Sequence, residues 1–170
     1  MQIRLLTPDD APEWWRLRHE SLTCEPEAFS SSADDPQSLK MEDVRNRLRA
    51  DSSEFFIVGA FDDGRLSGMA GFVREAGAKS RHKGRIWGVY VGTAKRGHGL
   101  GRKLLEAVLA RSSEIEGIEQ IMISVTATQT AAIALYRSLG FESFGREPRA
   151  LKIGPRYIDE EYLSLPSKPL

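Results

Sequence analysis

Residues 95–103 read KRGHGLGRK, and Gly97, Gly99 and Gly101 alternate with other residues between two pairs of basic side chains. A strand candidate at Arg85 to Val91 precedes this stretch, and apolar residues at helical spacing follow it. We therefore expect a glycine-rich turn that links a strand to the first turn of a helix. Such a turn exposes several backbone N–H groups that have no partner within the helix.

A turn of this kind is suited to binding phosphate. The free N–H groups lie in a field equivalent to about half a positive charge, and glycine permits positive φ and a close approach by the ligand. The flanking Lys95, Arg96, Arg102 and Lys103 add about 1 kcal/mol or less each, because exposed charges interact weakly. The sequence therefore predicts that backbone amides hold a phosphate group.

Two common nucleotide motifs do not match this stretch. A Walker loop needs Ser or Thr after its lysine to hold magnesium, and here Lys103 is followed by Leu104. A dinucleotide fingerprint needs Gly-x-Gly-x-x-Gly near the first strand, whereas the spacing here is Gly-x-Gly-x-Gly in the second half of the chain. On these residues alone, a glycine turn with a purely structural role stays open.

Basic residues gather around the glycines, although the chain carries no formal net charge. No acidic residue occurs between Glu75 and Glu106. This segregation indicates a local anionic ligand rather than nucleic acid bound over the whole surface, with a solvated charged loop as the alternative. The basic residues between those two glutamates are Lys79, Arg81, Lys83, Arg85, Lys95, Arg96, Arg102 and Lys103.

The composition indicates one soluble globular domain over residues 1–170. Hydrophobic residues make up 41% and charged residues 28% of the chain, as is ordinary for that class. Cys24 is the only cysteine, so an intrachain disulfide and a cysteine-rich metal site are excluded and a cytoplasmic location is expected. No apolar run approaches the roughly 18 residues that span a bilayer, and we expect neither a signal peptide nor membrane association.

The remaining patterns predict a mixed sheet covered by helices. Asp62-Asp63-Gly64 predicts a hairpin between two apolar strands, and residues 24–37 are expected to form a loop. Strands are expected at residues 3–6, 54–61, 65–75, 85–91, 120–125, 141–144, 150–153 and 157–165, and helices from Pro8, at 39–48, at 99–117 and at 131–139.

Two stretches together resemble signatures of the GNAT family of N-acetyltransferases. Arg96-x-x-Gly99-x-Gly101, after a strand and before Arg102-Lys103-Leu104-Leu105, resembles the acetyl-coenzyme A signature, and AIALYRSLGF at 132–141 resembles the second one. The resemblance covers nearly the whole chain. It implies an α+β fold with mixed α/β character: a mostly antiparallel sheet of six to seven strands, splayed between the fourth and fifth strands and flanked by about four helices.

The resemblance also implies where acetyl-coenzyme A, the expected cosubstrate, would bind; no metal is expected. Pantetheine would lie in the gap of the splayed sheet as an added strand, and the diphosphate would lie on the glycine turn. This chain has Gln129 where the family usually has asparagine, so one bond to coenzyme A is in question. The implied cofactor-binding residues are Val89, Tyr90, Val91, Arg96, Gly97, His98, Gly99, Leu100, Gly101, Arg102 and Gln129.

For catalysis, Tyr136 matches the family position whose phenol protonates the departing sulfur; simple packing on a helix is the alternative. The strand at 85–91 lacks the carboxylate that many relatives use as a general base. His82, just before that strand, could titrate in the useful range. Glu54 and Glu75 are alternatives, and salt bridges are the ordinary role for each.

The activity implied is transfer of an acetyl group to a primary amine by direct attack in a ternary complex. A non-catalytic acyl-coenzyme A binding module is the alternative. The acceptor, a small molecule or a protein amine, would be bound by residues 14–24 and 25–36. Trp14 and Trp15 either line that cleft or pack in the core, and Asp159 belongs to the acceptor pocket or to a hairpin turn. Sheet edges near the C-terminus could pair with a second copy in a homodimer.

Overall fold

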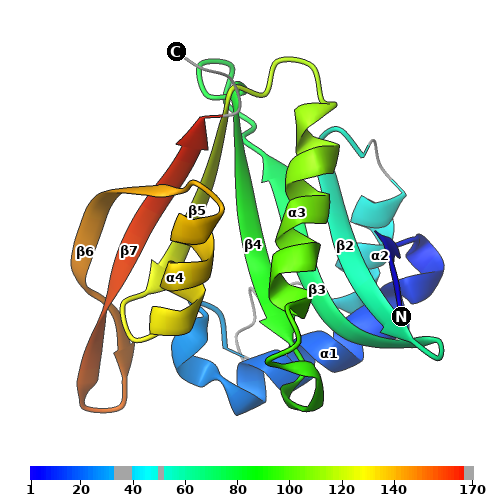
Figure 1. Cartoon of the computed structure of the whole chain (residues 1–170), viewed down its shortest axis with the longest axis horizontal. Helices are drawn as coiled ribbons and strands as arrows, with labels where there is room; N and C mark the ends of the chain where they lie inside the picture. The colour runs from blue at the N-terminus through cyan, green and yellow to red at the C-terminus, as the bar shows by residue number, and fades with distance from the viewer. Residues whose placement is uncertain (33–39, 50–51, 167–170) are drawn as a thin grey trace.

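The computed structural model describes residues 1–32, 40–49 and 52–166 (Figure 1). Within these ranges seven strands and four α-helices form a mixed α+β fold. The strands are β1 (Gln2–Leu5), β2 (Phe55–Asp62), β3 (Arg65–Arg74), β4 (Lys83–Val91), β5 (Gln120–Thr126), β6 (Glu142–Ile153) and β7 (Arg156–Pro166). The helices are α1 (Ala11–Cys24), α2 (Met41–Leu48), α3 (Leu100–Ser113) and α4 (Thr130–Ser138).

The seven strands form one sheet in the order β1-β2-β3-β4-β5-β7-β6. All neighbours are antiparallel except β4 and β5, which are parallel. The sheet is thus mostly antiparallel, with the expected number of strands and helices, and the predicted fold class is confirmed. The predicted hairpin is also present, since Asp62 pairs with Arg65 across the turn.

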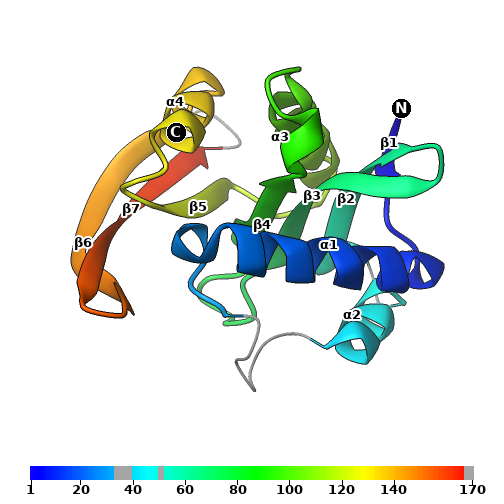
Figure 2. The same ribbon diagram turned by 90° about the horizontal axis from the view of Figure 1, so that it is seen from below.

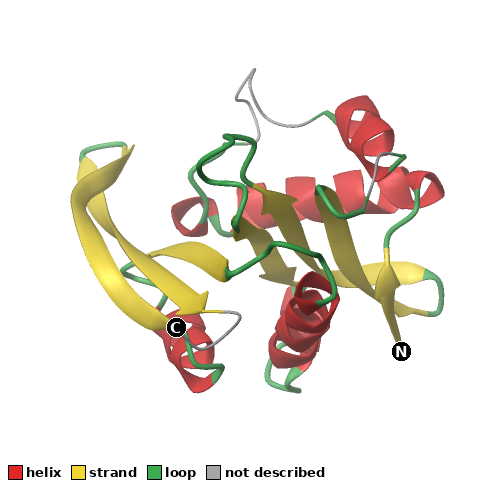
Figure 3. Ribbon diagram, turned by 90° about the horizontal axis from the view of Figure 1, so that it is seen from above, coloured by secondary structure: helices red, strands yellow, loops and turns green. Residues whose placement is uncertain are grey.

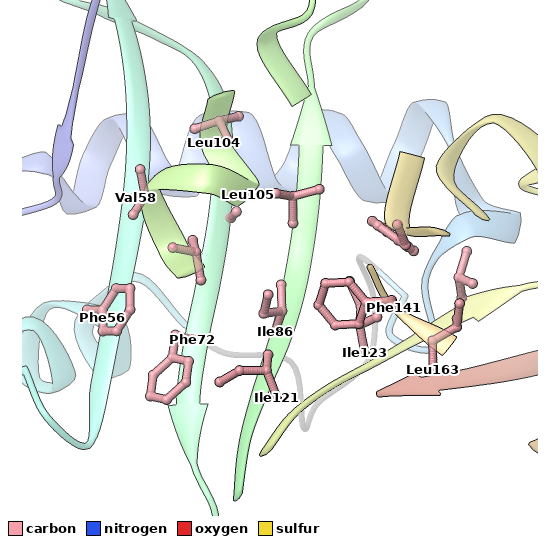
Figure 4. Close-up of a cluster of buried hydrophobic side chains, with 14 of the residues drawn as sticks. Phe56, Val58, Phe72, Ile86, Leu104, Leu105, Ile121, Ile123, Phe141 and Leu163 are labelled. Carbon is pink, nitrogen blue, oxygen red and sulfur yellow. The ribbon is translucent and has the colours of Figure 1, made fainter. Parts of the chain in front are cut away.

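The helices cover both faces of the sheet. Figures 2 and 3 show α3 and α4 on one face and α1 and α2 on the other. On the α3 side, residues of β2, β3, β4, β5 and β7 pack with Leu104 and Leu105 in one continuous core (Figure 4). On the α1 side, Trp14, Leu17 and Val44 pack on a second cluster that includes Phe55 and Met69. Apolar side chains of the strands therefore alternate between two covered faces.

The sheet opens between β4 and β5. The two strands pair only from Lys83 to Ile86, opposite Gln120 to Ile123, and they diverge beyond that point (Figure 1). A bulge marks the divergence: between the pairs Gly71–Trp87 and Met69–Tyr90, β4 has one residue more than β3. The extra length includes Gly88 at φ 61°. A bulge bends its strand, and this one lies where β4 leaves β5.

Several predicted boundaries were wrong. The helix expected from Pro8 does begin there, as a 3₁₀ turn at Pro8–Asp10 that continues into α1, whereas α3 ends at Ser113 rather than at 117. The strands expected at 141–144 and 150–153 form one strand, β6, with register shifts after Ser143 and Glu147. The loop at 24–37 is described as far as Ser32, and position 39, expected to begin the second helix, lies outside the described residues.

Candidate functional site

Two adjoining cavities lie at the split in the sheet. One, of about 450 Å³, is lined by β4, the glycine turn and α4, and we call it the loop cavity. The other, of about 340 Å³, is lined by β4, β5 and side chains that include Arg18, Arg47 and Arg85, and we call it the arginine cavity. Both are lined by Ala28, Phe29, Val89, Gln129, Ala132 and Tyr136. A ligand in one cavity would therefore lie next to a ligand in the other.

The glycine turn presents free backbone donors to the loop cavity. Gly97 and Gly99 have φ of 79° and 71°, and Gly99 is the N-cap of α3. The first amide of α3 with a main-chain partner is that of Lys103, which bonds to the Gly99 carbonyl at 3.2 Å. Among the described residues, no main-chain acceptor is found for the six N–H groups from Gly97 to Arg102. The turn has the geometry of an anion site at a helix N-terminus.

Arg96, His98 and Arg102, near the turn, already have protein partners. Arg96 donates to the Val91 carbonyl at 3.0 Å and pairs with Glu25 at 2.7 Å; the hydrogen bond from Arg96 to Glu25 raises the arginine pKa. Arg102 donates to the Ser138 hydroxyl at 2.5 Å. His98 is in contact with the Arg96 carbonyl at 2.8 Å through Nδ1 and is not among the described residues that line either cavity. The main chain, rather than these side chains, carries the free donors.

The last residues of β4 leave one strand edge open. Tyr90 and Val91 pair with Met69 and Gly68 of β3 on one side, whereas the pairing with β5 ends at Ile86. The open edge at Val89, Tyr90 and Val91 lines the loop cavity. An extended ligand could therefore bond there as an added strand does.

Tyr136 lies where the two cavities meet. Its side chain on α4 is 5% exposed, and its ring packs against Phe141 at 6.2 Å between centroids. Burial raises the pKa of its hydroxyl well above the ordinary value, so the group keeps its proton at neutral pH. Gln129, just before α4, also lines both cavities, and its carbonyl accepts the Ile133 N–H at 3.0 Å.

The candidate bases from the sequence lie elsewhere. His82 precedes the paired end of β4, where its carbonyl accepts the N–H groups of Glu119 and Gln120, and it does not line the described part of either cavity. Glu54 pairs with Arg81 at 2.5 Å, and Glu75 pairs with Arg85. Both glutamates have the salt bridges that were considered their ordinary role.

The two tryptophans considered for the acceptor cleft lie outside it. Trp14 is fully buried in the core under α1, and Trp15 is partly exposed. Neither tryptophan lines the described part of the two cavities.

Asp159 accepts hydrogen bonds from the backbone of Arg149 at 2.9 Å and from Arg146 at 3.0 Å. These bonds lower the pKa of the carboxyl, with the Arg149 backbone contributing most, so Asp159 joins β7 to the irregular part of β6.

None of the four charged residues that line the arginine cavity (Arg18, Arg47, Arg85 and Glu160) was predicted as a site residue. Glu160 of β7 is the one carboxylate among the described residues that line this cavity. It lies opposite Thr126 of β5. The Tyr162 hydroxyl, which donates to Glu147 at 2.6 Å, is 3.3 Å from a carboxylate oxygen of Glu160. Arg18 shares a face of α1 with apolar Trp14 and Leu17, and that pattern was the one sequence signal available for it.

The described residues contain no group of three or more His, Cys, Asp or Glu side chains placed to hold a metal ion. The same part of the chain contains no helix that is long and apolar enough to cross a bilayer.

Comparisons with known proteins agree with this geometry. L-methionine sulfoximine/L-methionine sulfone acetyltransferase of Pseudomonas paraeruginosa is 33% identical over 81 residues, which are 48% of this chain and 46% of that protein. The chain spans about half the length, or less, of the curated relatives it matches.

Solved structures share the fold. A GNAT-family acetyltransferase of Streptococcus pneumoniae has a TM-score of 0.86 at 24% identity, covering 97% of this chain and 98% of that one. The yncA protein of Salmonella typhimurium, solved with its cofactor acetyl-CoA, has a TM-score of 0.83 at 20% identity, covering 100% and 95%. The profile of the Acetyltransferase (GNAT) family matches residues 14–141. The chain therefore belongs to the GNAT acetyltransferase family.

Proposed function

We propose that this protein is an acetyl-coenzyme A dependent N-acetyltransferase that transfers the acetyl group directly to a primary amine in a ternary complex. The observation that carries the proposal is the run of free backbone N–H groups from Gly97 to Arg102 beside an open strand edge. Six donors at a helix N-terminus match a diphosphate. Residues 1–170 would act as one N-acetyltransferase domain.

The proposed coenzyme A site follows the loop cavity. The diphosphate would lie on Gly97 to Arg102, and pantetheine would extend along the main chain of Val89, Tyr90 and Val91 toward Tyr136. Gln129 lies beside this path and would contribute at most one bond. Arg96 would act mainly by holding the turn, because it bonds the Val91 carbonyl and Glu25, and His98 would support the turn through the Arg96 carbonyl.

Acetyl-coenzyme A supplies the thioester. The amine nitrogen forms a bond to the carbonyl carbon and the carbon–sulfur bond breaks, while one proton leaves the nitrogen and one reaches the sulfur. Tyr136 is the proposed donor to sulfur, since its hydroxyl is protonated at neutral pH and is next to both cavities. Protonation of a leaving group by a positioned side chain contributes about 100-fold or more to the rate.

Glu160 is the proposed proton acceptor, directly or through a water molecule. It lines the arginine cavity together with Tyr136, whereas His82 is at the other end of β4. An ionised carboxylate near an ammonium group favours its binding and can accept its proton. For this role the position of Glu160 is more favourable than that of His82.

The proposal also includes a cytoplasmic location and a homodimer. The single cysteine, Cys24, is exposed and free, which supports a cytoplasmic location because thiols stay reduced there.

β6 is the last strand of the sheet and carries Phe144, which is 57% exposed. An exposed edge with an aromatic side chain supports pairing with a second copy in a homodimer.

The test is release of free thiol from acetyl-coenzyme A on a panel of primary amines that includes small molecules and N-terminal peptides. Thiol release that depends on an amine, with the N-acetyl product seen by mass spectrometry, is the expected result. Glu160→Gln should lower turnover without weakening coenzyme A binding, whereas Glu142→Gln on exposed β6 should leave both unchanged. Tight coenzyme A binding without thiol release on any amine would favour a non-catalytic binding module.

A further inference from the structure

Arg18 is a partly buried cation for which no anionic partner is found among the described residues. Its Nη1 is inaccessible to solvent and has no hydrogen-bond acceptor among the described residues. The guanidinium lies 4.8 Å from the centre of the Phe29 ring. Desolvation lowers the arginine pKa to about 10, so the group is still charged at neutral pH. Charges that are withdrawn from water are usually paired, and Arg18 lines the arginine cavity.

The neighbouring arginine on the same helix shows the contrast. Arg16 donates to Glu13, to Glu20 and to the Leu66 carbonyl, with distances from 2.5 to 3.3 Å. The lack of a partner is therefore a property of the position of Arg18, and not of arginines on α1 in general.

Arg18 reaches the split in the sheet. A Cβ built on Gly88, the bulge residue of β4, would lie 3.8 Å from Nη1 of Arg18. The guanidinium is thus next to the point where β4 leaves β5, on the side of the cavity lined by α1. Arg18 and Glu160, the carboxylate that lines the same cavity, are not joined by an ion pair.

Of the other two arginines in the lining, only Arg85 has a carboxylate partner among the described residues. Arg85 is paired with Glu75, so its charge is compensated. Arg47 lies over the Phe55 ring at 5.4 Å and has no carboxylate partner in the described part of the chain. The described lining of the arginine cavity therefore carries an excess of positive charge at one side and a single carboxylate, Glu160, on β7.

We propose that the amine acceptor also carries a carboxylate, and that Arg18 binds that carboxylate. This rests on the proposed function, and it narrows the acceptor to free amino acids and similar amino carboxylates. A guanidinium holds a carboxylate through two parallel hydrogen bonds, while Glu160 faces the ammonium group. A cavity of about 340 Å³ suits a small molecule. A lysine within a protein, or a protein N-terminus, has no carboxylate next to its amine.

The test compares L-amino acids with their amides, which keep the amine and side chain and lose the negative charge. Hydrogen bonds to a charged group support a preference for the acid of about 10- to 100-fold in kcat/KM. Arg18→Met should remove that preference, because it should lower kcat/KM for the acid far more than for the amide. Arg18→Lys keeps the positive charge but cannot form the bidentate hydrogen bonds, so it should retain part of the preference for the acid. Arg45→Met, which removes a surface ion pair with Glu42, is the matched control and should behave as wild type.

The outcomes separate this inference from the proposed function. Equal turnover of acids and amides by the wild type would overturn the carboxylate site and leave the acetyltransferase standing. If no amine is acetylated, the proposed function fails, and calorimetry with the same amino acids then decides the site. Amino-acid binding that is lost in Arg18→Met but kept in Arg45→Met would support the carboxylate site. Absence of amino-acid binding to the wild type would overturn that site. Circular dichroism of each variant checks that it is folded.

Discussion

Tyr136 is the residue on which the proposed chemistry can be tested most directly. Tyr136→Phe keeps the packing of the ring against Phe141 and removes only the hydroxyl. We expect kcat to fall by about 100-fold, because a proton donor to the leaving group is lost, while coenzyme A affinity stays within about two-fold since the turn is untouched. Steady-state kinetics and calorimetry measure the two quantities.

Tyr157→Phe is the control for this change. Tyr157 is on β7, is 47% exposed and lies beside Arg149 and Lys152 rather than in the cavities. The same loss of a phenol hydroxyl should leave kcat unchanged there. If Tyr136→Phe turns over at the wild-type rate, the hydroxyl has no part in the mechanism and Tyr136 is a packing residue.

A second prediction concerns stability near the N-terminus. Asp10 pairs with Arg4 through two bonds of 2.7 and 2.8 Å, and the hydrogen bond from Arg4 is the main cause of its lowered pKa. The folded-state pKa is thus below the unfolded value of about 3.9. The stabilisation is present above pH 4 or so and is lost as the pH falls through the lower folded-state pKa.

Asp10→Asn should therefore lower the free energy of unfolding at pH 7 by about 1 kcal/mol, and the difference from wild type should shrink below about pH 4. Urea unfolding at several pH values measures this. Asp9→Asn serves as the control because Asp9 is exposed. A difference that persists undiminished at pH 2 would show that the carboxylate charge is not the source of the stabilisation.

Among the elements, the glycine turn is the one whose geometry the ligand would depend on. Gly99 has φ 71°, and a Cβ there would meet no atom within 4 Å. A β-branched side chain would thus be opposed by backbone strain rather than by a clash. Gly99→Val should raise the free energy of the positive-φ turn by about 1–2 kcal/mol. Coenzyme A binding should therefore weaken about ten-fold or more.

Gly145→Val is the matched control for the turn. Gly145 on β6 also has open space around its Cβ position, and its φ is not positive. Its substitution should leave coenzyme A affinity unchanged in the same calorimetric titration. Normal binding by Gly99→Val would mean that the diphosphate is not held by this turn.

The elements also show what the sequence could and could not predict. Periodicity and turn residues predicted the strand before the glycine turn and the helix after it, because these signals are local. Glu160 and Arg18 face one cavity only because β7 pairs with β5 and α1 packs on β3, and no local pattern encodes that. An isolated glycine within a strand, here Gly88, indicates a bulge. The direction in which the bulge bends the strand depends on the neighbouring strands, so the sequence alone could not predict it.

At the scale of the whole molecule, the sheet has two parts that meet along a short seam. β1 to β4 form one part and β5 to β7 the other, joined by pairing between Lys83–Ile86 and Gln120–Ile123. The core under α3 packs across this seam, since it includes Phe72 of β3 and Leu163 of β7 (Figure 4). Both proposed substrates would bind where the seam opens, so ligand binding should be linked to the stability of the fold.

This linkage gives the last prediction. Coenzyme A at about 100 times its dissociation constant should raise the free energy of unfolding by roughly 2.7 kcal/mol, which for a chain of this length is an increase in Tm of about 5–10 °C. Pantetheine lacks the diphosphate, so at the same concentration it should raise Tm far less. Gly99→Val should lose about half of the coenzyme A effect or more, whereas Gly145→Val should keep it, and differential scanning calorimetry measures all three proteins. Equal stabilisation by pantetheine and coenzyme A would mean that the free amides of the turn do not bind the diphosphate, because the strand edge alone would then account for the affinity.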